Sequence, residues 1–332
     1  MTQRYDEDRP HERFDRPRRH TRPRTKERPS YDDADSGWVI GVDRGRYTLL
    51  VGDDERAVTA MKSRPLGRKA VVVGDRVRVV GDTTGRPDTL ARIVEVEERT
   101  TVLRRTADDN DPIERVIVAN ADQMVVVAAL SDPPPRPRLI DRCLVAAFDA
   151  GMTPLVCLTK ADLGDPSALV EALVPLEVDV VVTERGGDLE MVRERLRGRT
   201  SVLVGHSGVG KSTLVNALVP DADLATGDVN VVSRRGRHTS TSTRVLPLPF
   251  GGWIVDTPGI RSFGLAHVSV ERLLAAFPDL ASAARDCPRG CLHTAEEPEC
   301  ALDVAAAEGQ LDASRVDSFR RLLASREGND LT

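Results

Sequence analysis

The sequence predicts a multidomain fold in which an N-terminal OB-type β-barrel, a circularly permuted P-loop α/β domain and a C-terminal helical domain follow one another. Three observations predict it: short β-like runs before residue 100, alternating strand and helix patterns around a glycine-rich loop, and a Cys/His cluster near the C-terminus. The expected segments are a disordered charged tail (1–36), the barrel (37–99), the α/β domain (100–266) and the C-terminal domain (267–332).

The composition favours a globular protein over a membrane or secreted one. The chain has 332 residues, 40% of them hydrophobic, and no apolar run approaches the roughly 20 residues that span a membrane. The N-terminus is charged and lacks the apolar core of a signal peptide. Three of the five cysteines lie within residues 287–300, which does not resemble a secreted disulfide framework. We therefore expect a monomeric cytoplasmic protein.

The N-terminal half carries the excess of basic residues. Residues 1–28 hold ten Lys and Arg against six Asp and Glu, and residues 37–105 hold fourteen against ten, although the net charge of the chain is −5. A surface that binds a polyanion is therefore expected in this half, with an ordinary solvated surface as the alternative. The tail has too few apolar residues to fold alone, and it either contacts RNA or serves as a solubilising extension.

Short β-like runs separated by turn residues predict the barrel. The runs are Trp38–Ile40, Tyr47–Val51, Val71–Val73, Arg76–Val80 and Ala91–Val96. No helical period intervenes, so five strands of an OB-type barrel are expected, with RNA as the usual class of ligand. An SH3-like barrel would show a similar pattern.

Strand and helix patterns alternate in the next domain, which indicates a parallel sheet with helices on both faces. The expected strands are Gln123–Leu130, Leu155–Leu158, Val178–Thr183 and Ser201–Val204, and the expected helices are Leu139–Ala150 and Leu189–Leu196. Three further helices, Val270–Phe277, Ala301–Glu308 and Ala313–Ala324, are expected in the C-terminal domain.

A glycine-rich loop of the pattern Gly-x4-Gly-Lys-Ser follows the expected strand 201–204 and precedes a helical run, 211–218. Its residues are Gly205, His206, Ser207, Gly208, Val209, Gly210, Lys211, Ser212 and Thr213. This setting is typical of a loop whose amides wrap the phosphates of a nucleotide. We expect Lys211 to reach the β- and γ-phosphates, Ser212 to bind Mg²⁺ and Thr213 to lie near the α-phosphate.

A second segment of the expected nucleotide site follows the run Trp253–Val255. Asp256 ends this run and is expected to hold a Mg²⁺-bound water, while the amide of Gly259 is expected to meet the γ-phosphate. The polar segment 233–243 between the two motifs is suited to a switch loop. There Thr239 or Thr241 would complete the Mg²⁺ shell, and an ordinary basic loop is the alternative.

The tetrapeptide Thr159-Lys160-Ala161-Asp162 directly follows another expected strand. An Asp carboxylate accepts both N1–H and the 2-amino group of guanine, which adenine does not offer, so Asp162 indicates guanine specificity. The stem of Lys160 is expected to pack over the base. The companion segment Val182–Arg185 matches the usual base-binding loop poorly and is assigned no side-chain role. Because the guanine motif precedes the phosphate loop, the pattern predicts a circularly permuted P-loop α/β GTPase domain that binds GTP and GDP.

Three cysteines and one histidine lie within 14 residues near the C-terminus. They are Cys287, Cys291, His293 and Cys300. A Cys3His set is typical of a closed structural zinc site, which predicts a helical zinc-binding domain with one ion. Cys143 and Cys157 lie in apolar runs and are expected in the core.

The whole set resembles the ribosome small-subunit biogenesis GTPases of the RsgA or YjeQ family. The resemblance rests on the motif order and on the stretches Val73–Val77, Ala119–Gln123, Gly205–Thr213, Gly236–Thr239 and Glu297–Cys300. It implies an OB domain, a permuted GTPase domain and a zinc domain that together bind the 30S subunit and its 16S rRNA late in maturation. It further implies that the subunit stimulates GTP hydrolysis, which promotes release. The family's ligand spacing of four and five residues is three and six here.

Ile260 lies where Ras-like enzymes carry the glutamine that orients water. A hydrophobic side chain cannot do this, so slow intrinsic turnover is expected, with His206, His238 or a ribosomal group as the catalytic candidates. Lys211 and Asp256 favour a GTP phosphohydrolase. The alternatives are a nucleotide-controlled RNA- or ribosome-binding module with negligible turnover, and a GTPase that serves metal delivery or tRNA modification.

Overall fold

The structure, a computed structural model, describes residues 31, 33–67, 70–106, 114–222, 243–257, 263, 265 and 268–327. Residues from Asp33 onward form one compact unit. The expected site residues His238, Thr239 and Gly259 lie outside the described residues, as does almost all of the predicted tail. Among the helices that are described, none is long and apolar enough to cross a membrane.

The N-terminal strands form a closed five-stranded barrel, which confirms the predicted barrel architecture. Its strands are β1 (Asp35–Asp43), β2 (Arg46–Val51), β3 (Arg56–Lys62), β4 (Arg76–Gly81) and β5 (Ala91–Val96), in the order β1-β2-β3-β5-β4. The barrel closes where β1 pairs with β4 in antiparallel register. Its core consists of alternate strand residues such as Val39, Leu49 and Ile93, which are fully buried.

The prediction of a barrel strand at Val71–Val73 is wrong. The barrel contains β3 instead, which was not predicted. Only Val58 and Ala60 of β3 are buried, and the charged and polar residues around them hide the strand pattern. The three valines are nevertheless buried, and Val71 packs in the core of the barrel without belonging to a strand. Val73 forms a single bridge with Val118 of the next domain, and the amide of Val72 donates to the carboxylate of Asp75.

The second domain contains a six-stranded sheet in the order β10-β9-β8-β11-β13-β12. Its strands are β8 (Gln123–Ala129), β9 (Thr153–Thr159), β10 (Asp179–Val182), β11 (Thr200–Val204), β12 (Arg244–Pro247) and β13 (Trp253–Asp256). All neighbouring pairs are parallel except β12 with β13. A separate hairpin of β6 (Val102–Thr106) and β7 (Glu114–Ala119) precedes the sheet and was not predicted.

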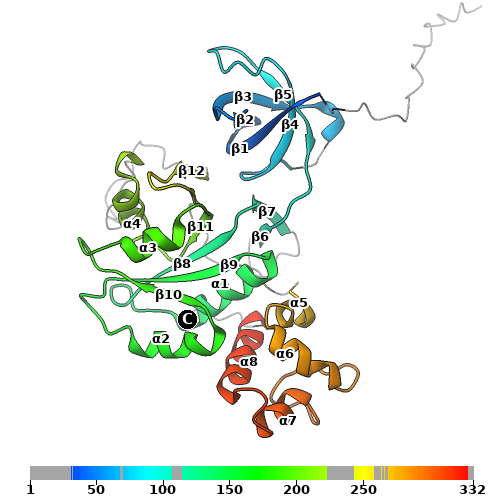
Figure 1. Cartoon of the computed structure of the whole chain (residues 1–332), viewed down its shortest axis with the longest axis vertical. Helices are drawn as coiled ribbons and strands as arrows, with labels where there is room; N and C mark the ends of the chain where they lie inside the picture. The colour runs from blue at the N-terminus through cyan, green and yellow to red at the C-terminus, as the bar shows by residue number, and fades with distance from the viewer. Residues whose placement is uncertain are drawn as a thin grey trace, which may run out of the picture. The chain divides into compact units, whose positions relative to one another are not determined.

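Helices cover both faces of this sheet, as expected (Figure 1). They are α1 (Pro137–Ala150), α2 (Ser167–Leu173), α3 (Glu190–Leu196) and α4 (Lys211–Leu218), with 3-10 turns at Val174–Leu176 and Pro220–Ala222. Strand β8 is buried along its whole length because its successive side chains enter two cores. Val126 packs in the core that contains α1 and α2, and Val127 packs in the core that contains α3 and α4.

The C-terminal helices share the core on the α1 face of the sheet. They are α5 (Val270–Leu274), α6 (Pro278–Ala283), α7 (Ala301–Ala307) and α8 (Ala313–Glu327), with 3-10 turns at Ala284–Asp286 and, in the barrel, at Arg64–Leu66. Phe277 contacts Phe148 of α1 and Phe319 of α8 edge-on, with ring centroids 5.2 and 5.5 Å apart. The C-terminal helices therefore pack in the same core as α1.

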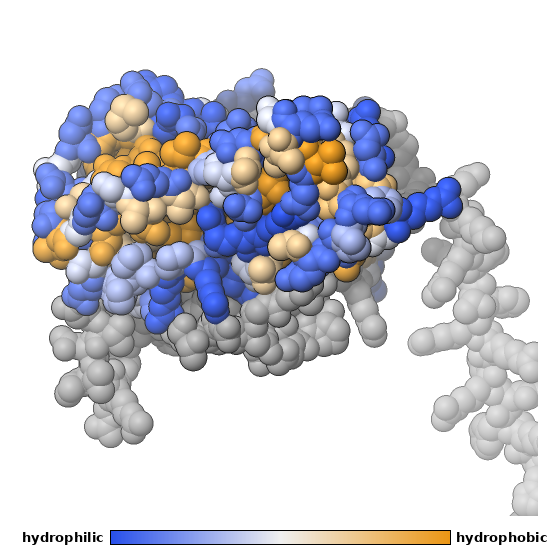
Figure 2. All heavy atoms as spheres, turned by 90° about the horizontal axis from the view of Figure 1, so that it is seen from below, coloured by the Kyte–Doolittle hydropathy of each residue, from blue (hydrophilic) through white to orange (hydrophobic). Residues whose placement is uncertain are grey.

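Part of the apolar surface remains accessible in the C-terminal domain. Leu292 and Val304 are 54% and 52% exposed. Figure 2 shows hydrophobic residues interspersed with hydrophilic ones on the face that is seen from below. This face is therefore not uniformly polar.

A dense set of polar contacts joins the barrel to the segment that precedes the sheet. Asn120 donates from Nδ2 to the carbonyl of Gly74 at 2.9 Å and accepts at Oδ1 from the amide of Thr100. The fully buried carboxylate of Asp75 pairs with Arg99, with Nε and Oδ1 2.7 Å apart. Buried carboxylates need such partners because an unpaired one is costly. These contacts lie beside Val73, which is buried where the barrel meets this segment.

The two tryptophans of the chain form a second contact between barrel and sheet. Trp38 of β1 meets Trp253 of β13 edge-on, with ring centroids 4.9 Å apart. The guanidinium of Arg76 lies 5.5 Å from the centre of the Trp38 ring. Both interactions favour a fixed arrangement of these strands.

Substituting Gly74 tests the contacts that join the barrel to the segment before the sheet. Gly74 has a φ of +91°, and a Cβ there would collide with the carbonyl oxygen of Ala119. We expect Gly74→Ala to lower the free energy of unfolding by roughly 3 kcal/mol or more, because backbone cannot give way as a flexible side chain can. Urea denaturation measures this loss. Gly45→Ala is the matched control: its φ is +82° with open space around it, and it should cost only about 1 kcal/mol. Equal losses would contradict the account.

Candidate functional site

The three sequence motifs of the expected nucleotide site lie at one edge of the sheet. Thr159 ends β9, Gly205 follows β11 and Asp256 ends β13. Strands β9, β8, β11 and β13 are consecutive neighbours and run parallel, so their carboxyl ends meet at the same edge. Ligands of open α/β sheets bind at this edge.

The glycine-rich loop wraps closely against strand β8 before it enters α4. Gly205 has a φ of +151°, and a Cβ there would collide with the carbonyl oxygen of Val127. Only glycine therefore allows the loop to turn at this point. Helix α4 begins at Lys211, so its unpaired N-terminal amides and those of the loop face the same space. Such an arrangement binds anions.

Lys211 is held inside the loop. Its Nζ donates to the carbonyls of Gly205 at 2.6 Å and His206 at 2.9 Å. Burial lowers the pKa of the Lys211 ammonium, and the charge of nearby Asp256 opposes this shift. The structure thus brings Lys211 and Asp256 close enough for their charges to interact at this edge of the sheet.

The guanine-type motif is bonded directly to the phosphate-type loop. The buried hydroxyl of Thr159 lies 2.6 Å from the carbonyl oxygen of Val209 and donates to it. The carbonyl of Ala128 lies farther away, at 3.4 Å. Next in the chain, the ammonium of Lys160 donates to the carbonyl of Asp132 in the loop after β8. Two segments that are 50 residues apart therefore form one structural unit.

The segment after β10, to which the sequence assigned no side-chain role, also reaches the guanine-type motif. The carbonyl of Thr183 accepts from the amide of Ala161 at 3.1 Å, and the amide of Thr183 donates to Leu158 at 2.7 Å. The side chain of Thr183 is buried, whereas Asp162 is exposed at the surface of the motif. The only sequence signal for this contact was that Thr183 directly follows a strand, β10, which lies next to β9.

Thr257 anchors the end of β13 and was not singled out from the sequence. Its buried hydroxyl donates to the carbonyl of Leu203 in β11 at 3.0 Å. Asp256 lies in register with the same residue of β11. Ser212, in the first turn of α4, and the carboxylate of Asp256 are the described oxygen groups suited to Mg²⁺ at this edge.

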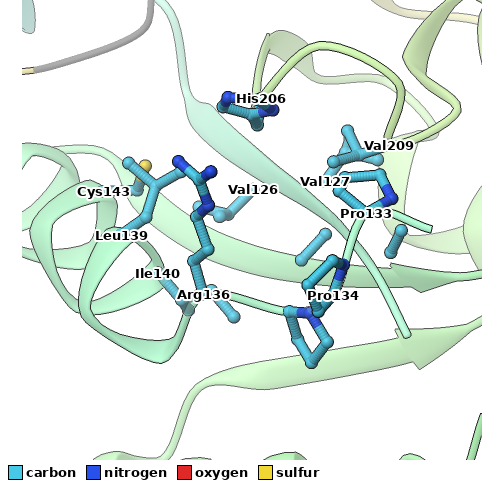
Figure 3. Close-up of a pocket in the computed structure, with 14 residues that line it drawn as sticks. Val126, Val127, Pro133, Pro134, Arg136, Leu139, Ile140, Cys143, His206 and Val209 are labelled. Atoms are coloured by element: carbon cyan, nitrogen blue, oxygen red, sulfur yellow. The ribbon is translucent and has the colours of Figure 1, made fainter. Parts of the chain in front are cut away.

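An apolar pocket, open to solvent, lies beside the glycine-rich loop. The ends of β8, the 133–136 loop and the first turns of α1 line it together with His206 and Val209 (Figure 3). The ring Nδ1 of His206 lies 2.9 Å from the carbonyl oxygen of Ser207. His206, one of the two histidines expected to orient water, is therefore placed on the wall of this pocket.

The four expected metal ligands converge in the C-terminal domain. The Sγ atoms of Cys287, Cys291 and Cys300 lie 3.5, 3.4 and 3.8 Å from Nδ1 of His293. All four ligand atoms lie within 4.8 Å of one another. A tetrahedral zinc ion with its usual bond lengths separates sulfur from nitrogen by about 3.5 Å. The donor set and its spacing are compatible with zinc, despite the altered loop lengths between the ligands.

Neighbouring groups orient these ligands. The amide of Ala301 donates to Sγ of Cys287 at 3.2 Å, as expected for a thiolate acceptor. Arg320 donates from Nε to the carbonyl of His293 at 3.0 Å and pairs with Asp303. Hydrogen bonds of this kind, from groups beside the ligands, hold metal ligands in place.

Comparison with known proteins finds close similarity along most of the chain. A family model described as RsgA GTPase matches residues 96–266. The chain is 37% identical to the small ribosomal subunit biogenesis GTPase RsgA of Chlorobaculum parvum, over 87% of this chain and 97% of that one. It is 36% identical to the protein of the same name from Gemmatimonas aurantiaca, over 86% and 96%.

Solved structures show the same fold. The crystal structure of YjeQ from Thermotoga maritima has a TM-score of 0.65 and 25% identity, and covers 89% of this chain and 99% of that one. The structure of YloQ, a circularly permuted GTPase, has a TM-score of 0.64 and 26% identity, and covers 91% and 98%. These similarities confirm the predicted resemblance and the order of barrel, permuted α/β domain and C-terminal domain.

The bond between Thr159 and Val209 can be tested with a near-isosteric change. Thr159→Val removes only the hydroxyl and leaves the carbonyl of Val209 without its donor, so the free energy of unfolding should fall by about 1–3 kcal/mol. Urea denaturation of the ligand-free chain measures it. Thr183→Val is a matched control, because the nearest partner of that buried hydroxyl among the described residues is the carbonyl oxygen of Leu158 at 3.4 Å, so its loss should cost less than about 1 kcal/mol. A loss no larger at position 159 than at 183 would refute the link.

The cluster should bind one zinc ion with an affinity that falls as the pH is lowered. Burial raises the pKa of the Cys291 thiol to about 11 and also raises that of Cys287, so protons compete with the metal for these sulfurs. A chromophoric chelator should therefore remove zinc more readily at pH 6 than at pH 8. Cys300→Ala should abolish binding, whereas Cys143→Ala, at a buried cysteine that is not one of the four ligands, should keep it. Zinc retained by the Cys300 variant would exclude this ligand set.

Proposed function

The chain belongs to the RsgA GTPase family, and from this membership we propose that it is a late-stage maturation factor that binds the 30S ribosomal subunit through 16S rRNA. In this proposal it hydrolyses GTP to GDP and phosphate, is stimulated by the subunit, and uses hydrolysis to time its release. The proposal includes a monomeric chain that acts in the cytoplasm. It also includes domain boundaries after residues 36, 99 and 266.

The observation that carries the proposal is the direct bond between the guanine-type motif and the phosphate-type loop. Thr159 and Val209 meet across the end of β8 although their order along the chain is reversed. One nucleotide can therefore contact both segments at once. The names of the relatives, small ribosomal subunit biogenesis GTPase, support the choice of partner.

In this proposal, different residues of the chain bind the guanine base and the phosphates. Asp162 accepts from guanine N1–H and the 2-amino group, and the stem of Lys160 covers the base beside Ala161. The amides of the loop from Gly205 to Thr213 wrap the phosphates, and Lys211 neutralises charge on the β- and γ-phosphates. Mg²⁺, when bound, would supply positive charge that offsets the charge of the phosphates. We assign its ligands to Ser212 and Thr239, with Asp256 holding a coordinated water.

Hydrolysis needs a water molecule in line with the γ-phosphate. We propose that the amide of Gly259 contacts the γ-phosphate and that the hydrophobic Ile260 leaves the water without an orienting side chain in the isolated protein. His206, on the wall of the apolar pocket, His238 or a ribosomal group supplies the missing contact. Slow intrinsic turnover and partner stimulation both follow from this arrangement.

The barrel and the C-terminal domain supply contacts with the partner in this proposal. The basic excess of residues 37–105 suits the phosphate backbone of rRNA. The C-terminal domain shares its core with α1, so a contact there bears directly on the nucleotide-binding domain. The lack of a water-orienting glutamine favours one alternative, a nucleotide-controlled binding module with negligible turnover.

Phosphate release from GTP, measured with and without purified 30S subunits, tests the function. We expect a basal rate on the order of 10⁻⁴ s⁻¹ and a rise of at least about tenfold with 30S subunits. Lys211→Ala should abolish both rates, which excludes a contaminating GTPase. Purified 50S subunits are the matched partner control and should leave the rate unchanged.

Distinct outcomes would reject distinct parts of the proposal. A rate that no subunit changes would leave the binding module as the function. Stimulation by 50S but not 30S subunits would overturn the choice of partner. In the same assay Asp162→Asn should lose its preference for GTP over other purine nucleotides, and an unchanged preference would refute the base assignment.

A further inference from the structure

The short strand β13 contacts the barrel at one end and carries a group of the expected nucleotide site at the other. Trp253, its first residue, meets Trp38 of the barrel edge-on, with ring centroids 4.9 Å apart. Asp256, its last residue, is close enough to Lys211 of the glycine-rich loop for their charges to interact. The strand has four residues, so a displacement of its first residue bears directly on the last.

The two central residues of β13 hold the strand between two cores. Ile254 packs in the core that contains α3 and α4, and Val255 packs in the core that contains α1 and α2. Both side chains are fully buried. Protein interiors are close-packed and transmit strain, so a strand that is buried in this way moves as one element.

The barrel fixes Trp38 on its own side. Trp38 is 6% exposed and lies in register with Arg76 of β4, whose guanidinium is 5.5 Å from the centre of the indole ring. The next residue, Val39, is bonded to the segment before β4. Its amide donates to the carbonyl of Asp75 at 2.9 Å, and its carbonyl accepts from the amide of Gly74 at 2.8 Å. Trp38 is therefore held as part of the barrel.

The same segment before β4 joins the barrel to the chain that enters β8. Asn120 donates to the carbonyl of Gly74 at 2.9 Å, and the amide of Ala119 donates to the carbonyl of Val73 at 3.0 Å. Strands β8 and β13 are the two neighbours of β11, which leads into the glycine-rich loop. The barrel thus contacts the chain at the start of both strands that flank β11.

We propose that the contact between Trp38 and Trp253 couples a ligand on the barrel to the nucleotide site, with Trp38 as a positioning residue for the strand that carries Asp256. Rings in edge-to-face contact prefer a defined geometry, so a shift of one ring displaces the other. The inference rests on the proposed function, which supplies the 30S subunit and GTP as the two ligands, and it adds the regulation of that site.

Coupling between two sites is reciprocal. The exchange of GDP for GTP therefore changes the affinity for the 30S subunit by the same factor by which the subunit changes the preference for GTP over GDP. The contact between the two rings can be tested from either side.

Intrinsic fluorescence tests the contact from the nucleotide side, because Trp38 and Trp253 are the two tryptophans of the chain. In Trp253→Phe the barrel residue Trp38 is the single fluorophore, and the phenyl ring keeps an edge-on partner for it. We expect its emission to shift when a non-hydrolysable GTP analogue replaces GDP. In Trp253→Leu, which has no ring at this position, the shift should be lost. An unresponsive Trp38 in Trp253→Phe, or a response retained in Trp253→Leu, contradicts the inference.

Binding to purified 30S subunits tests the contact from the barrel side. The measured quantity is the ratio of the 30S affinities of the analogue-bound and GDP-bound chain. Trp38→Leu should reduce this ratio by about fivefold or more, with the Kd for GDP within about twofold of the unchanged chain. Trp38→Phe should keep the ratio within about twofold.

Ile93→Val is the matched structural control. Ile93 is fully buried in the barrel core on β5, which lies between β3 and β4 and not beside β1. The substitution should lower the Tm and leave the affinity ratio within about twofold. It therefore separates a loosened barrel from a lost contact with Trp253.

Two results of the binding test would overturn the inference. Trp38→Leu could leave the affinity ratio unchanged, or the ratio could fall equally in Trp38→Leu and Ile93→Val, which would indicate a loss of barrel stability alone. If Trp38→Leu does not fold, Trp253→Leu removes the same contact from the other side and decides the matter. If 30S subunits do not bind the unchanged chain, the proposed partner is rejected instead, while the fluorescence of Trp38 still tests the link to the nucleotide.

Discussion

Strands β9, β8, β11 and β13 run in the same direction and lie side by side, and the expected nucleotide site depends on this arrangement. Parallel strands end at a common edge, so the segments that leave them are brought together wherever they occur in the chain. The central strand β8 stays in place because its alternate side chains are buried in two cores. Across its end, the hydroxyl of Thr159 reaches the carbonyl of Val209 and joins the two motifs.

The reversed order of the motifs has a structural consequence beyond the sheet. Pairing between strands does not depend on which of them comes first, so the site is retained while the chain leaves the domain at a different point. Here it leaves after β13 and enters helices that pack on α1. Phe277 contacts an aromatic ring on each side of this boundary. Arg142 then bonds to both the departing chain and α8.

Several elements could be predicted because their signals are local. The glycine-rich loop with the helix at Lys211–Leu218 and the strand that ends at Asp256 depend on short-range periodicity and spacing. The barrel strand β3 was missed because only Val58 and Ala60 of it are buried. Burial also misled the prediction at Val71–Val73, since Val71 packs in the barrel core and Val73 in the core of the sheet although neither lies in a barrel strand. Thr183 and Thr257 were missed for a different reason: their partners Leu158 and Leu203 lie on strands that were predicted, but the sequence does not show which strands are neighbours in the sheet.

The sequence by itself determined the family, the order of the domains, the expected nucleotide motifs and the Cys3His set, because each is encoded by residue types at fixed spacing. The tertiary structure decided which residues connect these parts. Asn120 bonds to Gly74, Thr159 to Val209 and Arg142 to Phe263, over separations of 46, 50 and 121 residues. Such contacts arise from strand order and helix packing, and no local pattern specifies them. The motifs could thus be found in the chain, but the bonds that join them could be found only in the folded protein.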